Sequence, residues 1–127
     1  MLTLQKRVFL ADKDVLLVGV DEVDEMLMRY MVAEQDANLI VENTAKGAIA
    51  KISDRKYDLL IINTRVENVN SLDLIHKMRA NKEIRVPVIG LTSRDMSGRA
   101  LFSGFDYVIR RPLEKSKFLS ALQKVIA

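Results

Sequence analysis

Five short segments of the chain are almost continuously apolar and rich in β-branched residues. They occupy residues 15–20, 38–42, 57–63, 86–92 and 107–109. An apolar run without strict alternation is typical of a strand buried on both faces, as in a parallel sheet that is covered by helices. The pattern therefore predicts five strands inside an α/β domain.

The segments between these strands carry apolar residues at helical spacing. Residues 23–35 place one such group on one side of a helix, the arrangement of a helix that packs by its apolar face: Val23, Met26, Leu27, Tyr30 and Met31. Shorter patterns of the same kind span residues 44–52, 71–80 and 114–127, and a weaker one lies within 95–104. Strand and helix thus alternate, which predicts a doubly wound three-layer sandwich with a five-stranded parallel sheet.

Composition narrows the chemistry of this domain. The 127 residues suit one compact domain; they include no Cys and a single His, His76, so disulfides, thiolate nucleophiles and Cys-based zinc sites are excluded. No apolar run approaches the ~20 residues of a membrane span, and the first residues lack the features of a secretory peptide. We expect a cytoplasmic protein that does not contact membrane.

Charge is unevenly distributed along the chain. Residues 1–64 hold 8 Lys and Arg against 11 Asp and Glu, whereas residues 65–127 hold 12 against 6. A basic half favours acidic partners or nucleic acid, although an excess of this size is also typical of an ordinary solvated surface. No helix-turn-helix pattern, aromatic platform or Lys/Arg run supports nucleic-acid binding.

The third predicted strand ends on an amide, Asn63. Ligands of open α/β folds collect at the carboxyl edge of the sheet, so a residue at this position is a candidate for chemistry. An amide carries no charge and cannot attack as an oxygen nucleophile.

Four stretches, DVLLVGVDE at 14–22, YDLLIINTR at 57–65, VPVIGLTS at 86–93 and GFDYVIRRPL at 104–113, resemble the receiver domain of two-component response regulators. The resemblance covers residues 15–126 and implies a flavodoxin-like fold with strand order 2-1-3-4-5. In that family an acidic pair after the first strand holds Mg²⁺, and an Asp ending the third strand accepts a phosphoryl group. A Thr or Ser ends the fourth strand, and Lys-Pro follows the fifth.

Most of these functional residues are replaced in this chain. The resemblance marks five vestigial site positions: Gly19 and Val20 for the acidic pair, Asn63 for the acceptor, Thr92 for the hydroxyl and Arg111 for the Lys. Mg²⁺ requires carboxylate oxygens, so we expect no metal, no cofactor and no catalytic residue. Arg111 could donate to Asn63 or to a nearby carboxylate. The resemblance also implies a cis bond from Arg111 to Pro112.

A surface for partner proteins is implied by the same resemblance. Such domains usually bind through the fourth helix, fifth strand and fifth helix, where this chain offers Arg94, Arg99, Tyr107, Arg110, Lys115 and Lys117. In receivers, an aromatic residue two or three positions before the Lys often reports activation. Here that position is occupied by Val108, and Tyr107, one residue earlier, points to the opposite face of the strand. An acidic or phosphorylated signalling protein is the expected partner.

Near the amino terminus, the start of the first strand and the role of the residues before it each have more than one interpretation. Residues 7–14 could be the first strand, with Asp12 and Asp14 as the acidic pair, but this would force the apolar run 15–20 into a helix. We prefer the pair at Gly19 and Val20. Residues 1–13 then form an extension, as an arm or an extra strand with a role in self-association, ahead of a domain at 14–127. Asp21 and Glu22 are expected to open the first helix.

The sequence therefore predicts a pseudo-receiver, a receiver fold that acts in two-component signalling as an interaction module without phosphorylation. One alternative is a domain that binds a small effector or nucleic acid. Another is an active receiver with a different acceptor, such as Thr64, Ser93 or Asp58. Asp58 would lie at the far edge of the sheet, and the two hydroxyl residues lack a base and a metal.

Overall fold

A computed structural model describes residues 8–64, 71–81, 84–92 and 104–126, with side chains described from Leu74 onward in the third helix. The strands are β1 (Asp14–Val18), β2 (Asn38–Glu42), β3 (Leu59–Asn63), β4 (Val88–Thr92) and β5 (Tyr107–Arg110). The helices are α1 (Glu22–Glu34), α2 (Ala45–Asp54), α3 (Ser71–Ala80) and α5 (Lys115–Val125). All strand pairs are parallel, in the order β2-β1-β3-β4-β5, which confirms the predicted topology.

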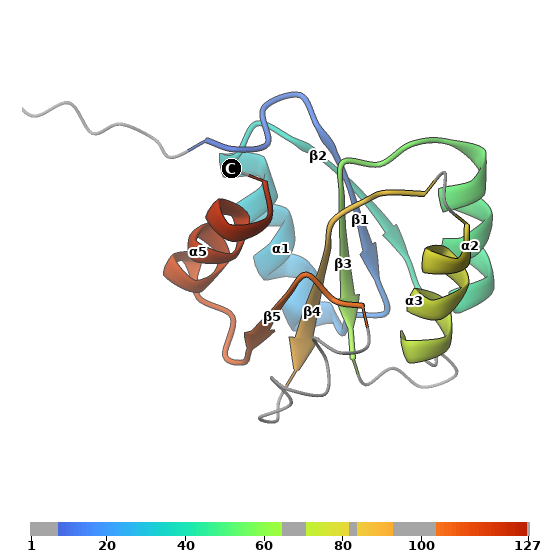
Figure 1. Ribbon diagram of the computed structural model, residues 1–127. Coiled ribbons are helices and arrows are strands. Elements are labelled where there is room, and N and C mark those ends of the chain that lie inside the picture. The colour runs from blue at the N-terminus through green and yellow to red at the C-terminus, as the bar shows by residue number, and fades with distance from the viewer. Residues whose placement is uncertain (1–7, 65–70, 82–83, 93–103, 127) are drawn as a thin grey trace, which may run out of the picture.

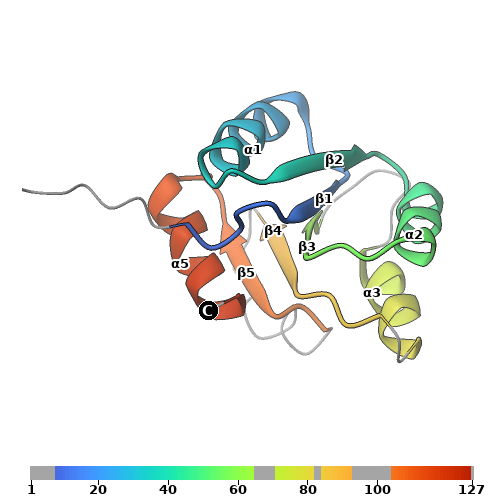
Figure 2. The same ribbon diagram turned by 90° about the horizontal axis from the view of Figure 1, so that it is seen from above.

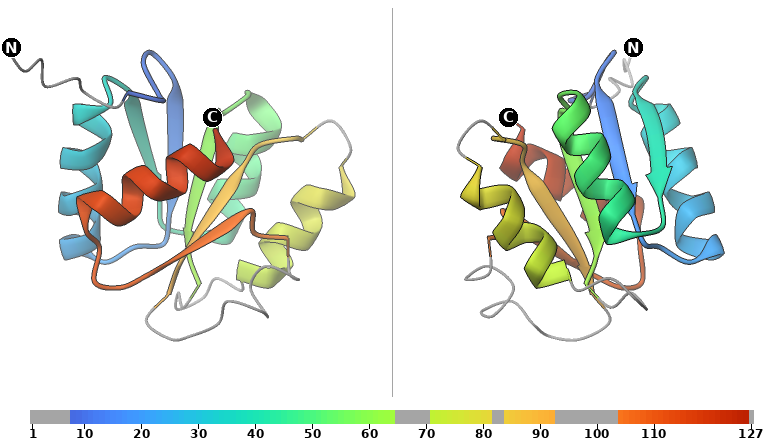
Figure 3. Two further views of the ribbon diagram at one scale, coloured as in Figure 1. Left: turned by 60° about the vertical axis from the view of Figure 1, so that its left-hand side comes forward. Right: turned by 90° about the vertical axis from the view of Figure 1, so that its right-hand side faces the viewer.

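The helices cover both faces of this sheet. Helices α1 and α5 lie on one face and α2 and α3 on the other (Figures 1 and 2). Alternate residues of each strand point to opposite faces, so Leu17 and Ile61 join the cluster under α1 and α5, while Leu16 and Ile62 join the cluster under α2 and α3. Figure 3 shows the two helical layers from opposite sides. The carboxyl ends of β1, β3 and β4 meet at one edge, which is where the candidate site lies.

The preferred alignment of the first strand is confirmed. β1 begins at Asp14, so Asp12 and Asp14 lie at the amino edge of the sheet, and the alternative acidic pair is wrong. Asp14 forms an ion pair with Arg55, and its backbone N–H donates to Asp58 Oδ2 at 2.8 Å. Asp58 therefore belongs to the same amino edge, far from Asn63.

The segment that precedes β1 packs onto the domain. In its described part, residues 8–13, Leu10 is fully buried in the cluster under α1 and α5. The Phe9 N–H donates to Gln35 Oε1 at 2.7 Å, and the Asp12 N–H donates to the Asp36 carbonyl at 2.9 Å. None of residues 8–13 is in a strand, so this stretch contributes a core side chain and contacts to the end of α1 instead of an extra strand.

Helix α1 buries a different face from the one its apolar pattern predicts. Its buried residues are Asp24, Met28, Met31 and Val32, of which only Met31 belongs to the predicted group. The other four predicted residues are exposed, by 67% for Val23, 73% for Met26, 40% for Leu27 and 64% for Tyr30. The helix is thus rotated so that a carboxylate points inward and an apolar row points outward.

Two further expectations concern the remaining elements. The helix predicted within 95–104 lies outside the described residues, apart from Gly104, whose φ of 98° is left-handed. In the parts of the chain that the structure describes, no helix has the length and apolar character to cross a membrane.

Candidate functional site

Of the five vestigial site positions that the resemblance marks, four lie along the carboxyl edge of the sheet. Gly19 follows β1 with a φ of 70°, a left-handed conformation that suits Gly, and its N–H donates to the Glu42 carbonyl at 2.9 Å. Asn63 ends β3 and is buried, and its Nδ2 donates to the Gly19 carbonyl at 3.1 Å. Two of the predicted site residues are therefore in direct contact, through an amide and a backbone oxygen. Val20 turns away and packs on the cluster under α1 and α5.

The other two predicted positions extend this edge toward β5. Thr92 ends β4 and is 1% exposed. Its carbonyl accepts from the Arg111 N–H at 2.7 Å, which places the start of the loop after β5 against the end of β4. Thr64, one of the alternative acceptors, donates its hydroxyl to the Leu91 carbonyl at 2.9 Å. The bond from Arg111 to Pro112 is cis, as the resemblance implied.

Arg111 binds a carboxylate that sequence reasoning missed, Asp24 on α1. The Arg111 Nε lies 2.8 Å and Nη2 lies 2.7 Å from Asp24 Oδ2. The Arg111 side chain is 19% exposed and that of Asp24 is 8% exposed, so water screens this ion pair little. Of the two partners that the sequence left open for Arg111, the structure shows the carboxylate.

The neighbouring acidic residues have structural partners. Asp21 is the N-cap of α1, and its Oδ1 accepts from the Asp24 N–H at 2.8 Å. Glu22 begins the helix, where negative charge meets the positive end of the helix dipole. The expectation that this pair opens the first helix is confirmed.

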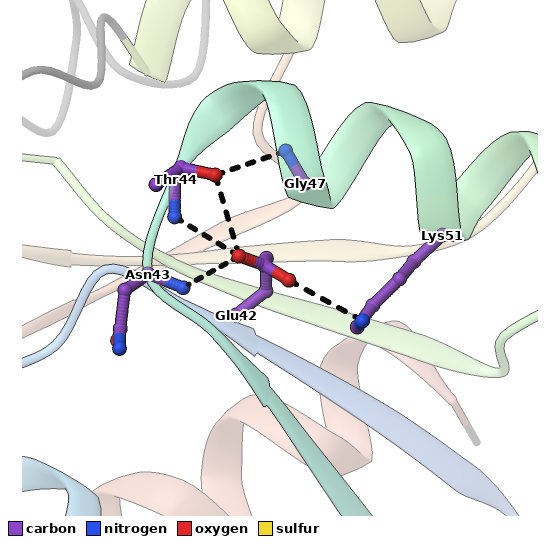
Figure 4. Close-up of polar contacts among 5 residues, drawn as sticks. All are labelled: Glu42, Asn43, Thr44, Gly47 and Lys51. Carbon is purple, nitrogen blue, oxygen red and sulfur yellow. Dashed lines mark hydrogen bonds and ion pairs between the residues drawn. The ribbon is translucent and has the colours of Figure 1, made fainter.

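The carboxylate of Glu42, the last residue of β2, also lies at this edge of the sheet. Glu42 Oε1 accepts from the N–H groups of Asn43 and Thr44 at 3.1 and 3.3 Å and from the Thr44 hydroxyl at 3.3 Å (Figure 4). Its Oε2 lies 3.3 Å from Lys51 Nζ. Thr44 in turn caps α2 by accepting from the Gly47 N–H at 3.0 Å. A Cβ on Gly47 would collide with the Glu42 carboxylate, so a side chain at position 47 would displace that carboxylate from the network.

The pKa of Glu42 is lowered from its ordinary value of 4.5. Partial burial acts in the opposite direction and would raise it. The hydrogen bond and positive charge of Lys51, together with the backbone N–H groups of Thr44 and Asn43, outweigh burial because they stabilise the ionised form. Glu42 is thus a fixed negative charge within the fold.

The residues at this edge do not fit a magnesium site. Gly19 and Val20 offer no side-chain oxygen, and Asn63 offers a neutral amide, whereas Mg²⁺ is bound through carboxylates. Asp21 is used as a cap and Asp24 is paired with a guanidinium. Across the described ranges, no group of three or more His, Asp or Glu is placed to hold a metal ion.

The predicted interaction face is described only in part. Tyr107, Arg110 and Lys117 line a hollow of about 280 Å³ between β5 and α5. Arg94 and Arg99 lie outside the described residues. Tyr107 and Val108 pack on opposite faces of the sheet, as predicted.

Two of the predicted cations are held within the domain. Lys115 Nζ lies 3.2 Å from Glu34 Oε1 on α1, and Lys117 Nζ donates to the carbonyls of Arg110 and Pro112, each at 3.1 Å. Arg110 is exposed at the end of β5. The face therefore presents cations whose positions are fixed by the loop after β5 and by α1.

The chain was compared with known proteins by sequence and by structure. No protein-family profile matches the chain. It is 24% identical over 126 residues to "Probable transcriptional regulator ycf29" of Pyropia yezoensis; the match covers 95% of this chain and 53% of that protein, so the chain spans about half the length of this relative.

Two solved structures have the same architecture. One is the receiver domain of the sensor histidine kinase PA1611 of Pseudomonas aeruginosa PAO1, which has a magnesium ion coordinated in its active site cleft. It aligns at a TM-score of 0.81 and 21% identity, over 91% of this chain and 98% of that domain. The other is the chemotaxis response regulator CheY4 of Vibrio cholerae. It aligns at a TM-score of 0.80 and 14% identity, over 90% of this chain and 98% of that chain. The chain therefore has the flavodoxin-like receiver fold.

The ion pair of Asp24 and Arg111 should be energetically coupled. In a double-mutant cycle with Asp24→Ala and Arg111→Ala, we expect a coupling free energy of about 1–3 kcal/mol, because each single change leaves a poorly solvated charge. Urea denaturation of the four proteins measures it. The exposed pair of Glu25 and Arg29, 3.1 Å apart, is the matched control and should couple by under about 0.5 kcal/mol. Equal coupling in the two cycles would contradict this assignment.

The Glu42 network should make stability depend on pH in the acid range. Because the folded-state pKa is lowered, its contribution is present above the ordinary value of 4.5 and is lost as pH falls through the folded value. Glu42→Gln should therefore lower the free energy of unfolding at neutral pH, and the difference from wild type should shrink as the pH falls below 4.5. Denaturation at several pH values measures this difference.

Gly47→Ala provides a second variant for the same network. At other helix positions this change stabilises the helix by about 1 kcal/mol. Here the new methyl group would displace the Glu42 carboxylate. We expect it to reduce the acid dependence as Glu42→Gln does. Wild-type acid dependence in both variants would show that the network does not stabilise the fold.

Proposed function

We propose that this chain is an atypical receiver that works without phosphorylation, as a protein–protein interaction module in cytoplasmic signal transduction. It catalyses no reaction of its own and takes no cofactor. The receiver fold and the similarity to a protein named as a transcriptional regulator support the broader assignment to signalling. The loss of phosphorylation rests on the chemistry of the carboxyl edge.

The observation that carries this proposal is the ion pair of Arg111 and Asp24. In receivers the resemblance assigns this position to a Lys that acts beside the phosphorylated Asp. Here the side chain is a guanidinium held by a carboxylate of α1, 2.7 Å away. The position that would contact a phosphoryl group instead ties the loop after β5 to the first helix.

Charge at the same edge argues against metal-dependent chemistry. Phosphoryl transfer to an Asp needs a metal ion to neutralise developing charge and an ionised carboxylate to attack. Asn63 is neutral, and its amide donates to the Gly19 carbonyl. The available carboxylates, Asp21 and Asp24, are used to cap α1 and to bind Arg111.

The partner is expected to be an acidic signalling protein, bound on the surface of Tyr107, Arg110, Lys115 and Lys117, with Arg94 and Arg99 in the adjoining sequence. The hollow between β5 and α5 gives this surface a concave shape, and its rim carries cations. Arg is favoured at interfaces because its planar fork binds carboxylates at two points.

Phosphorylation independence is tested by incubation with Mg²⁺ and a small phosphodonor, followed by intact mass measurement. We expect no added phosphoryl group on the wild type or on Asn63→Asp, because Gly19 and Val20 still supply no metal ligand. As the matched control, Gly19→Asp, Val20→Asp and Asn63→Asp combined should bind Mg²⁺ detectably by calorimetry. A phosphoryl group on the wild type would overturn the proposal, and one on Asn63→Asp alone would show that the metal-site assignment is wrong.

The interaction face is tested by capture from a lysate on immobilised protein, with identification of the bound protein and titration against it. Arg110→Glu should weaken binding by about tenfold or more, and salt should weaken wild-type binding, because the contact is charged. Lys46→Glu, an exposed change on α2 across the sheet, should bind like wild type. Equal affinity for the two variants would place the partner elsewhere.

A further inference from the structure

The outer side of α1 carries a continuous row of exposed apolar side chains. Val23, Met26, Leu27 and Tyr30 are 67%, 73%, 40% and 64% exposed, and Ala33 continues the row. Spacings of three, four and seven residues place these side chains along one stripe of the helix. Single exposed apolar residues are common on proteins, but a continuous row of them marks a surface that binds another molecule.

Polar contacts fix this row on the outside. Asp24, near the start of α1, is held inward by Arg111, and Gln35, just after its end, accepts from the Phe9 N–H at 2.7 Å. Met28 and Val32 fill the core between these two contacts. A rotation of the helix that buried the row would break both contacts. Figure 2 shows that α1 lies at the outside of its layer, with no described helix or strand over the side away from the sheet.

The charged residues on one flank of the row would complement the same flank of a second copy. Glu22 and Arg29 are exposed, seven residues apart, and so lie on the same flank at opposite ends of the row. If a second α1 lies antiparallel about a two-fold axis, this flank meets its own copy. Glu22 of each copy then faces Arg29 of the other, and Met26 and Leu27 meet at the axis.

We propose that the apolar row binds a second copy of this chain, so that α1 pairs with α1 in an antiparallel, two-fold symmetric dimer. Met26 and Leu27 form the centre of the interface, Val23 packs against Tyr30 of the other copy, and Glu22 pairs with Arg29. This dimer does not depend on the loss of phosphorylation, and it leaves the basic face at β5 and α5 open to a partner protein.

The size of the row sets the strength expected of the dimer. Side chains of these sizes at these exposures present on the order of 400 Å² in each copy, so the pairing removes about 800 Å² before the flanking residues are counted. That area belongs to the small class of interfaces, for which weak, micromolar association is typical. We therefore expect a reversible dimer with a concentration-dependent mass.

Sedimentation equilibrium of the full chain from about 1 to about 500 µM tests the proposal across this range. The weight-average mass should rise from 14.4 kDa toward twice that value. Met26→Glu puts two like charges at the axis and should raise the dissociation constant at least tenfold. Ala50→Glu, the same new charge at an exposed position of α2, should dimerise like wild type.

A charge reversal tests the two-fold geometry itself. Glu22→Arg and Arg29→Glu should each weaken the dimer, because each places like charges together, and the two changes combined should restore it. Circular dichroism shows that every variant is folded. A mass of 14.4 kDa at all concentrations, or wild-type dimerisation by Met26→Glu, would overturn the proposal. Failure of the combined variant to regain affinity would overturn the antiparallel pairing.

Discussion

The ion pair of Asp24 and Arg111 joins residues 87 positions apart in the sequence and sets two properties of the domain at once. It holds a guanidinium at the edge of the sheet where Asn63 ends its strand, and it turns the first helix so that a carboxylate faces inward. The chemistry of the edge and the outward position of the apolar row on α1 therefore both depend on this contact. A change at either residue would alter both.

The strands could be predicted from sequence because their signal is local. A strand buried on both faces is apolar at nearly every position, and β2 and the end of β3 fall where the apolar runs predict them. The predicted runs at 57–63 and 86–92 begin two residues before the strands β3 and β4 do. The order of the strands followed from the resemblance and from the handedness of crossovers.

The buried face of α1 could not be predicted in the same way. Two stripes of the helix compete for the core, and the more apolar one contains Val23, Met26 and Tyr30. The stripe that is buried contains Asp24, which is favourable only because Arg111 lies opposite it. That partner comes from the far end of the chain. For the same reason Asp24 and Glu42 were not singled out from the sequence, because the role of each depends on a residue of another element, Arg111 for Asp24 and Lys51 for Glu42.

The contact between Gly47 and Glu42 has a consequence for how this sequence can change. The carboxylate lies in space that a side chain at position 47 would fill. A side chain at position 47 would displace the Glu42 carboxylate from its present partners, whereas a shorter residue at 42 would leave position 47 unconstrained. Relatives of this protein that carry a side chain at position 47 should therefore lack this arrangement of the Glu42 carboxylate, while the Thr44 cap, which accepts from a backbone N–H, can remain.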